Sequence, residues 1–234
     1  MWVSLLHSKL THIVKDIMLE NYFSTPTIEN SYYAGFIAAD GCIVDKVIRG
    51  QNKLQIILSE QDYSLLHNLH LSLQLGDKKI SYRPSRVFRQ DNKDYFRKPS
   101  YCFSVSSNKI CEDLYSNWNI TPRKTNTLLP PNLSDEKLIK TFLIGVIDGD
   151  GCIYLGDYLE LSIVGNSKQF LLWCKKSLSD IGNIIECPTL INHHGGFRVK
   201  YSNNKAKKII SSLLEVDVPR LKRKWEKVSC LKGF

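Results

Sequence analysis

The chain has 234 residues, of which 43% are hydrophobic and 24% charged, and its net charge is +9. This length allows one large domain or two small ones with hydrophobic cores. No apolar run approaches the roughly 20 residues that a bilayer-spanning helix needs, and charged side chains interrupt the N-terminal residues, so we expect neither a membrane partner nor a cleaved signal peptide. We therefore expect an intracellular protein.

The excess of Lys and Arg favours a polyanionic partner, either a nucleic acid or an acidic membrane surface. The excess is local, because residues 76–101 hold eight Lys or Arg against three Asp, and residues 219–227 hold five against one Glu. Such segments are typical of a binding surface. The seven cysteines contain no CxxC pair, which favours reduced thiols packed as small hydrophobic side chains over a zinc site.

The first 25 residues are predicted to form a helical extension, because apolar residues recur at spacings of three and four over residues 1–20. A second helix is predicted from about residue 27 to residue 39, after the capping sequence Ser24-Thr25-Pro26-Thr27. We expect Gly41 to end it as a C′ glycine.

Strands over residues 43–48 and 54–58 follow and read as a hairpin, and residues 61–75 read as a helix. His67 and His70 lie three apart on this helix, but without a third ligand nearby they favour a helix surface or core edge over a metal site.

A second hairpin is predicted from strands near residues 80–88 and 100–106. Its long loop interleaves Arg89, Lys93, Arg97 and Lys98 with Tyr95 and Phe96. Cations suit phosphate and flat rings suit sugars and bases, so this loop favours a nucleic-acid contact over a solvated loop without a partner.

The same order of elements then repeats. A helix over residues 109–118 and a linker over residues 120–131 close the first half (residues 26–131). The second half (residues 132–234) is predicted to contain helices 134–150, 167–181 and 204–214 and hairpins 152–155/158–164 and 184–191/197–201. We therefore predict an α+β fold of duplicated αββαββα units related by an approximate twofold axis.

The two helices that open the halves carry matching sequences, YAGFIAADGCI at residues 33–43 and LIGVIDGDGCI at residues 143–153. Their Gly and Ala residues allow close approach of the two helices, which would bring Asp40 and Asp150 together. Two adjacent carboxylates repel unless a cation relieves them, and Mg²⁺ takes carboxylate and phosphate oxygens together. A basic protein with such a site favours metal-dependent phosphodiester hydrolysis.

These paired sequences resemble the motifs of the LAGLIDADG homing endonucleases of the single-chain, two-motif kind, and the resemblance covers residues 27–227. It implies a Mg²⁺-dependent endonuclease with two or more divalent cations near Asp40 and Asp150. The backbone carbonyls at Ala39 and Gly149 are the further metal ligands that we expect. Asp148 is not assigned a catalytic role, because Ala38 stands at its counterpart in the first motif.

The resemblance also implies a basic residue near each acid. The internal repeat places these at Lys124 and Lys224, with Arg123, Lys222 and Arg223 as alternatives.

The family resemblance further implies a saddle of two antiparallel sheets that lies in the major groove of double-stranded DNA, in a monomer with internal pseudo-twofold symmetry. A two-stranded ribbon fits that groove, where each base pair is distinct. The outward-facing candidates for reading DNA are Lys46, Arg49, Gln51, Lys53, Gln55, Tyr82, Arg83, Arg86, Arg198 and Lys200.

The leading hypothesis is an endonuclease that breaks both strands of a long asymmetric target. The alternative from another class is a non-cleaving nucleic-acid binder on the same fold, such as an intron RNA maturase or a DNA-binding regulator; a bifunctional protein is a further alternative. Both acids favour the enzyme, because a binder needs no clustered carboxylates. An HNH-type nuclease that uses His193 and His194 is disfavoured, since the following Gly-Gly favours a hairpin tip.

Overall fold

The computed structural model describes residues 18–48, 50–76 and 80–232. All but the last three residues of the helix predicted over residues 1–20 lie outside this part, and those three form no helix. Among the described residues, no helix combines the length and the hydropathy that crossing a bilayer requires.

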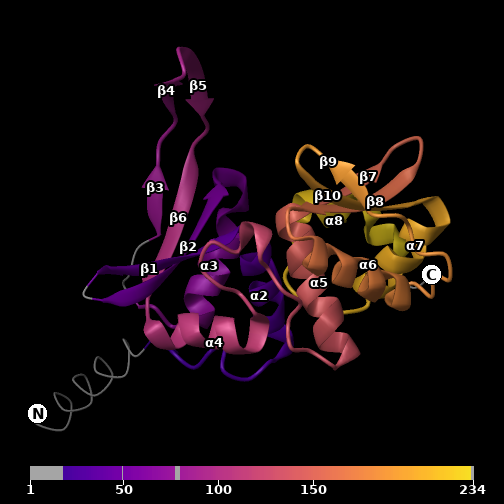
Figure 1. Cartoon of the computed structure of the whole chain (residues 1–234), viewed down its shortest axis with the longest axis horizontal. Helices are drawn as coiled ribbons and strands as arrows, with labels where there is room; N and C mark the ends of the chain where they lie inside the picture. The colour runs from indigo at the N-terminus through magenta and orange to yellow at the C-terminus, as the bar shows by residue number, and fades with distance from the viewer. Residues whose placement is uncertain (1–17, 49, 77–79, 233–234) are drawn as a thin grey trace, which may run out of the picture.

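The fold is a duplicated α+β unit, as predicted (Figure 1). The two sheets have the corresponding orders β1-β2-β6-β3 and β7-β8-β10-β9. The first half contains α2 (Ile28–Asp40), β1 (Gly41–Ile48), β2 (Gln51–Ser59), α3 (Tyr63–Ser72), β3 (Ser81–Arg83), β6 (Ser100–Ser106) and α4 (Asn108–Trp118). The second half contains α5 (Glu136–Asp150), β7 (Gly151–Leu155), β8 (Leu159–Gly165), α6 (Lys168–Ile181), β9 (Ile191–His193), β10 (Gly196–Ser202) and α7 (Asn203–Leu214).

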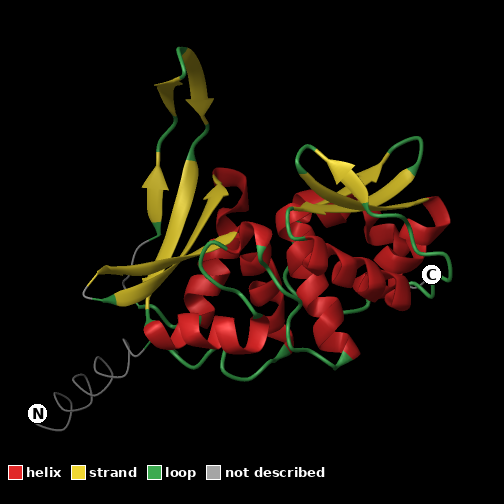
Figure 2. Ribbon diagram, in the orientation of Figure 1, coloured by secondary structure: helices red, strands yellow, loops and turns green. Residues whose placement is uncertain are grey.

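Helices cover one face of each sheet and leave the other face open (Figure 2). The alternation along β2 explains this layering, because Leu54, Ile56 and Leu58 are buried, whereas the preceding Lys53 and the intervening Gln55 are partly exposed. The hydrophobic core therefore lies between each sheet and its helices, and the open faces carry the polar side chains.

The two halves meet where α2 packs against α5. The glycines of the motifs set this distance: a Cβ on Gly35 would lie 1.9 Å from the carbonyl oxygen of Phe142, and one on Gly145 would lie 2.1 Å from that of Tyr32. No side chain fits at such separations. The predicted close approach of the motif helices is thus present, and it depends on residues without a Cβ.

The ends of α2 differ slightly from prediction. Thr27 is the N-cap, and it forms a capping box in which its backbone amide donates to the side chain of Asn30 at 2.7 Å. Gly41 is not a left-handed C′ glycine, because its φ is −81° and β1 starts there. A Cβ at this position would lie 2.7 Å from the side chain of Ile37, so space rather than backbone conformation demands glycine.

Three segments depart further from the predicted elements. The loop predicted between residues 88 and 100 is instead a hairpin, formed by β4 (Arg86–Gln90) and β5 (Lys93–Arg97). Asp91 and Asn92 make its turn with φ values of 49° and 59°, which both residue types tolerate. In the first half, α3 is shorter than the helix predicted over residues 61–75, and in the second half the strand predicted from residue 184 begins only at β9.

The C-terminal segment returns to the motif helices. It forms α8 (Lys222–Trp225) and η4 (Glu226–Leu231), in which Trp225 and Val228 are buried. The corresponding segment of the first half contains the short helix η3 (Lys124–Asn126). These two basic segments follow equivalent elements of the two halves.

Candidate metal and nucleic-acid site

Asp40 ends α2 and Asp150 ends α5, and the close packing of these helices brings their carboxylates near each other. A Cβ built on Gly149 would lie 2.3 Å from the Cβ of Ala39 and 3.5 Å from the carboxyl carbon of Asp40. Burial, followed by the negative charge of Asp40, raises the pKa of Asp150 to about 6. The two acids therefore form one electrostatically coupled site.

Burial by the surrounding protein also raises the pKa of Asp40, although this residue, at the end of α2, is exposed to solvent. The charges of Lys224 and Lys124 oppose this shift. Each acid thus lies in an environment that disfavours its charge, and the neighbouring lysines compensate only in part. A cation bound between the acids would remove this deficit.

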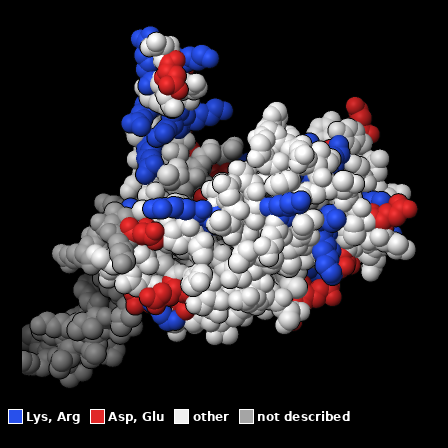
Figure 3. Space-filling view, in the orientation of Figure 1, with Lys and Arg blue, Asp and Glu red and all other residues white. Residues whose placement is uncertain are grey.

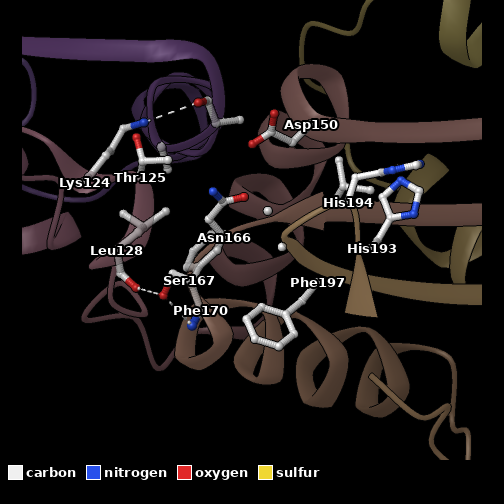
Figure 4. A pocket seen from close by; sticks show the side chains of 15 residues that line it. Lys124, Thr125, Leu128, Asp150, Asn166, Ser167, Phe170, His193, His194 and Phe197 are labelled. Carbon is white, nitrogen blue, oxygen red and sulfur yellow. Dashed lines mark hydrogen bonds between the residues drawn. The ribbon is translucent and has the colours of Figure 1, made fainter. Parts of the chain in front are cut away.

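Lys124 extends from η3 to the end of α2, where its ammonium group donates to the carbonyl oxygen of Ala39 at 3.3 Å (Figure 4). Burial lowers the pKa of Lys124, and Asp150 is the strongest of the charges that raise it again. The side chain remains partly exposed. Its ammonium group makes this single hydrogen bond within the described residues, so donors remain for a ligand.

Lys224 occupies the corresponding position in the second half, but it is more tightly held. Its ammonium group donates to the carbonyl oxygens of Ile147 (2.8 Å), Asp148 (2.6 Å), Gly149 (3.0 Å) and Gly151 (2.7 Å). These include carbonyls that the end of α5 leaves without helical partners. The residue is buried, which lowers its pKa. Lys224 therefore caps the helix that carries Asp150.

The alternative basic residues are placed elsewhere. Arg223 makes a two-pronged ion pair with Asp62, in which Nε and Nη2 each lie 3.0 Å from a carboxylate oxygen. Lys222 faces Glu226 at 3.7 Å on the surface, and Arg123 is exposed. Of the basic candidates, Lys124 and Lys224 are the two that bond to the motif helices.

Asp148 is fully buried and accepts three hydrogen bonds. The donors are the hydroxyl of Tyr32 at 2.7 Å, the backbone amide of Leu221 at 2.9 Å and the indole of Trp225 at 2.6 Å. These partners come from α2 and from the C-terminal segment. Asp148 therefore joins three parts of the chain, and its acceptor capacity is used within the core.

The open face of the first sheet carries part of the predicted DNA-reading set. Lys53 and Gln55 lie on it, Gln51 is exposed at the start of β2, and Arg83 donates to the sulfur of Cys102 at 3.2 Å. Arg86 lies beyond the sheet in β4. Arg49 lies outside the described residues, as does the side chain of Lys46.

Tyr82 does not share this face with Arg83. Its ring packs against Tyr101 with a centroid distance of 5.1 Å, and Tyr101 packs in turn on Tyr63 at the start of α3. Because successive residues of a strand point to opposite faces, Tyr82 and Arg83 cannot both face the same ligand. This corrects the expectation that both are outward-facing readers.

The open face of the second sheet contains an acid that the sequence reasoning missed. Glu160 is only 5% exposed, and it pairs with both predicted readers: Lys200 at 2.6 Å and Arg198 through a short contact. Arg198 also donates to the hydroxyl of Ser162 at 3.2 Å. Burial opposes ionisation, but the hydrogen bond from Lys200 and the charge of Arg198 hold the pKa of Glu160 below its ordinary value.

A cavity of about 370 Å³ opens beside Asp150 (Figure 4). Lys124 and Asn166 line it from two sides, and His193 and His194 line it from the tip of the β9–β10 hairpin. Within the described ranges, no group of three or more His, Cys, Asp or Glu side chains is placed to hold a metal ion. His193 and His194 therefore border the acidic site without belonging to such a group among the described residues.

No protein-family model matches the sequence, and no curated protein matches it. Solved structures do match. The homing endonuclease I-WcaI bound to its DNA recognition sequence has a TM-score of 0.54 at 12% identity, over 86% of this chain and 87% of that chain. The LAGLIDADG homing endonuclease I-GzeII in complex with its DNA target has a TM-score of 0.51 at 15% identity, over 88% and 91%. The LAGLIDADG meganuclease I-CpaMI bound to uncleaved DNA has a TM-score of 0.50 at 12% identity, over 86% and 90%. The chain therefore has the LAGLIDADG fold, as its two motifs predicted.

Proposed function

We propose that this protein is a site-specific DNA endonuclease that hydrolyses a phosphodiester bond in each strand of a long, asymmetric duplex target. It would act as a monomer, because each half supplies one acid. The proposal depends on one observation: Asp40 and Asp150 are coupled at the ends of two closely packed helices, between two open sheet faces. A protein that only bound nucleic acid would lose affinity through two carboxylates near phosphates.

The donor set at this site fits Mg²⁺. It offers two carboxylates and the backbone carbonyls of Ala39 and Gly149. Each of these two carbonyl oxygens accepts one hydrogen bond from a lysine and has a second lone pair. With no third acidic or histidine ligand among the described residues, water and substrate phosphate would fill the remaining positions, which is the coordination that Mg²⁺ prefers. Mg²⁺ bound there, as two or more ions, would activate a water molecule and stabilise the leaving oxygen.

The chain's own residues then have distinct tasks. Lys224 fixes the end of α5 and so holds Asp150 in place. Lys124 has donors free to contact the phosphate that is cleaved. The open faces of the two sheets, with Lys53 and Gln55 on one and Arg198 and Lys200 on the other, would lie in the major groove and select the sequence.

A cleavage assay tests the proposal. The first substrate is a duplex that joins the sequences flanking the gene, incubated with Mg²⁺ or with EDTA. We expect a double-strand break with Mg²⁺ and none with EDTA. Asp40→Asn and Asp150→Asn should each abolish the double-strand break while DNA binding is retained. Full cleavage by both variants would refute the assignment of the site.

A randomised-duplex binding selection provides a second source of substrates. If the native protein bound a selected sequence tightly but left it uncut with Mg²⁺ or Mn²⁺, the protein would be a non-cleaving binder and the enzymatic proposal would fail.

A further inference from the structure

The hairpin formed by β4 and β5 extends beyond the sheet of the first half and has no counterpart among the described residues of the second half. We define the arm as residues 84–99. These residues lie between Arg83, which ends β3, and Ser100, which starts β6 and pairs with Arg83. At the equivalent place in the second half, only His194 and Gly195 join β9 to β10. The arm projects on the side of the molecule where the tips of the second-half hairpins also project (Figure 1).

The arm forms a sheet of its own rather than packing on the body. All of its side chains are exposed except those of Phe88 and Pro99, which are partly exposed. Cross-strand contacts support it: Phe88 stacks on Tyr95 at 5.6 Å, and the guanidinium of Arg97 lies 5.4 Å from the Phe88 ring. An isolated two-stranded ribbon is only marginally stable in water. Contact with a partner would therefore stabilise the folded arm.

The arm is basic, and its cations form no ion pair within the described part of the chain. It contains five cations, Arg86, Arg89, Lys93, Arg97 and Lys98, against Asp91 and Asp94. None of the five forms an ion pair with a described residue. Lys and Arg side chains are concentrated on the arm in the space-filling view (Figure 3). The partner that this surface fits is a polyanion.

We propose that the arm binds the phosphate backbone of duplex DNA outside the surface read by the two sheets, and does so on one flank only. This rests on the proposed function, which places duplex DNA on the sheet that the arm continues. Phe88 and Tyr95 stack on each other and Arg97 lies over the Phe88 ring, whereas Phe96 is 65% exposed. A duplex is favoured over a single strand because the unpaired cations of the arm suit phosphates and because the sheet that the arm continues is the surface proposed to hold duplex DNA.

The length of the arm determines how much additional DNA it can cover. Eight residues from residue 84 to the turn, at about 3.3 Å each, reach about 26 Å, and about 8 base pairs rise over that distance at about 3.4 Å each. The protected DNA should therefore extend by up to about 8 base pairs more on the flank of the first half than on the flank of the second.

The salt dependence of binding to a mixed-sequence duplex of about 30 base pairs tests the arm. Each phosphate contact adds about 0.9 to the slope of log Kobs against log salt concentration. The triple variant Arg89→Gln, Lys93→Gln, Lys98→Gln should make that negative slope shallower by about 2 to 3, and Lys93→Gln alone should make it shallower by about 1. The matched control, Lys137→Gln, Lys205→Gln, Lys208→Gln, removes three exposed cations from α5 and α7 and should leave the slope unchanged.

The outcomes separate this inference from the proposed function. If the native protein binds the duplex and the arm triple binds with the same slope, the arm's role is refuted while the endonuclease proposal stands. If the native protein does not bind the duplex, the proposed function fails, and the arm's role fails with it. If the triple variant loses binding to single-stranded DNA or to an RNA duplex of the same sequence but keeps native binding to duplex DNA, the arm serves another nucleic acid and the inference is overturned.

Discussion

Replacing Asp150 with Asn should stabilise the protein at alkaline pH in the absence of divalent cations. Burial and the charge of Asp40 raise the pKa of Asp150 to about 6 from an ordinary value of 3.8. The ionised side chain is thus disfavoured in the folded protein relative to the unfolded chain. Asn has nearly the same shape and carries no charge, so the substitution removes this destabilisation.

The magnitude follows from the shift. A pKa raised by about 2 units corresponds to about 3 kcal/mol, at 1.36 kcal/mol per unit. Because the folded pKa is raised, the stability contribution of the protonated group is fully present below about pH 4 and is lost as the pH rises through 6. Asp150→Asn should therefore gain up to about 3 kcal/mol at pH 8, or several degrees in Tm for a chain of this size. The gain should vanish near pH 4.

Urea unfolding at pH 4 and pH 8, with EDTA present, measures both values. Asp157→Asn, in the exposed turn between β7 and β8, is the control and should change stability little at either pH. Mg²⁺ added at pH 8 should stabilise the native protein and have a smaller effect on Asp150→Asn, because the variant lacks one ligand. No gain at pH 8, or an equal gain at both pH values, would refute the raised pKa of Asp150 on which the prediction depends.

Three further substitutions test other parts of the structure. Lys224→Met should lower the free energy of unfolding by at least about 1–3 kcal/mol, because it leaves buried carbonyls of α5 without donors; urea unfolding checks this, and Lys222→Met on the surface should cost far less. Gly35→Ala should destabilise by about 1–3 kcal/mol or more, since its Cβ would lie 1.9 Å from a carbonyl oxygen of α5; a native Tm would contradict the close packing of α2 and α5. Glu160→Gln should strengthen binding to non-specific duplex DNA and steepen its salt dependence, because it frees two basic side chains on the open face. Unchanged binding in a gel-shift titration would show that these side chains do not face DNA.

The sequence by itself determined the features that local patterns encode. Periodicity placed most of the helices and hairpins, and the repetition of their order predicted the duplicated α+β fold. Glycine and alanine in the two motifs predicted that α2 and α5 approach closely, because only small residues permit that distance. The matching Asp-Gly ends then selected Asp40 and Asp150 as the pair of acids.

Some local signals were also missed. Asp91-Asn92 between two segments that contain aromatic residues could have predicted the hairpin of the arm, since both residue types tolerate positive φ in a tight turn. The expected left-handed conformation at Gly41 was wrong, because the demand there is steric and arises from the preceding helical turn.

The tertiary structure alone decided which side chains are committed to one another. Lys224, Arg223 and Lys222 are adjacent in the sequence, yet one caps α5, one pairs with Asp62 and one lies on the surface. Likewise, Asp148 is bound within the core by Trp225 and other donors, and Glu160 is paired beneath the open face. Such pairings join residues far apart in the chain, and no local periodicity records which of several neighbouring cations or acids lies within hydrogen-bonding distance once the two halves pack together.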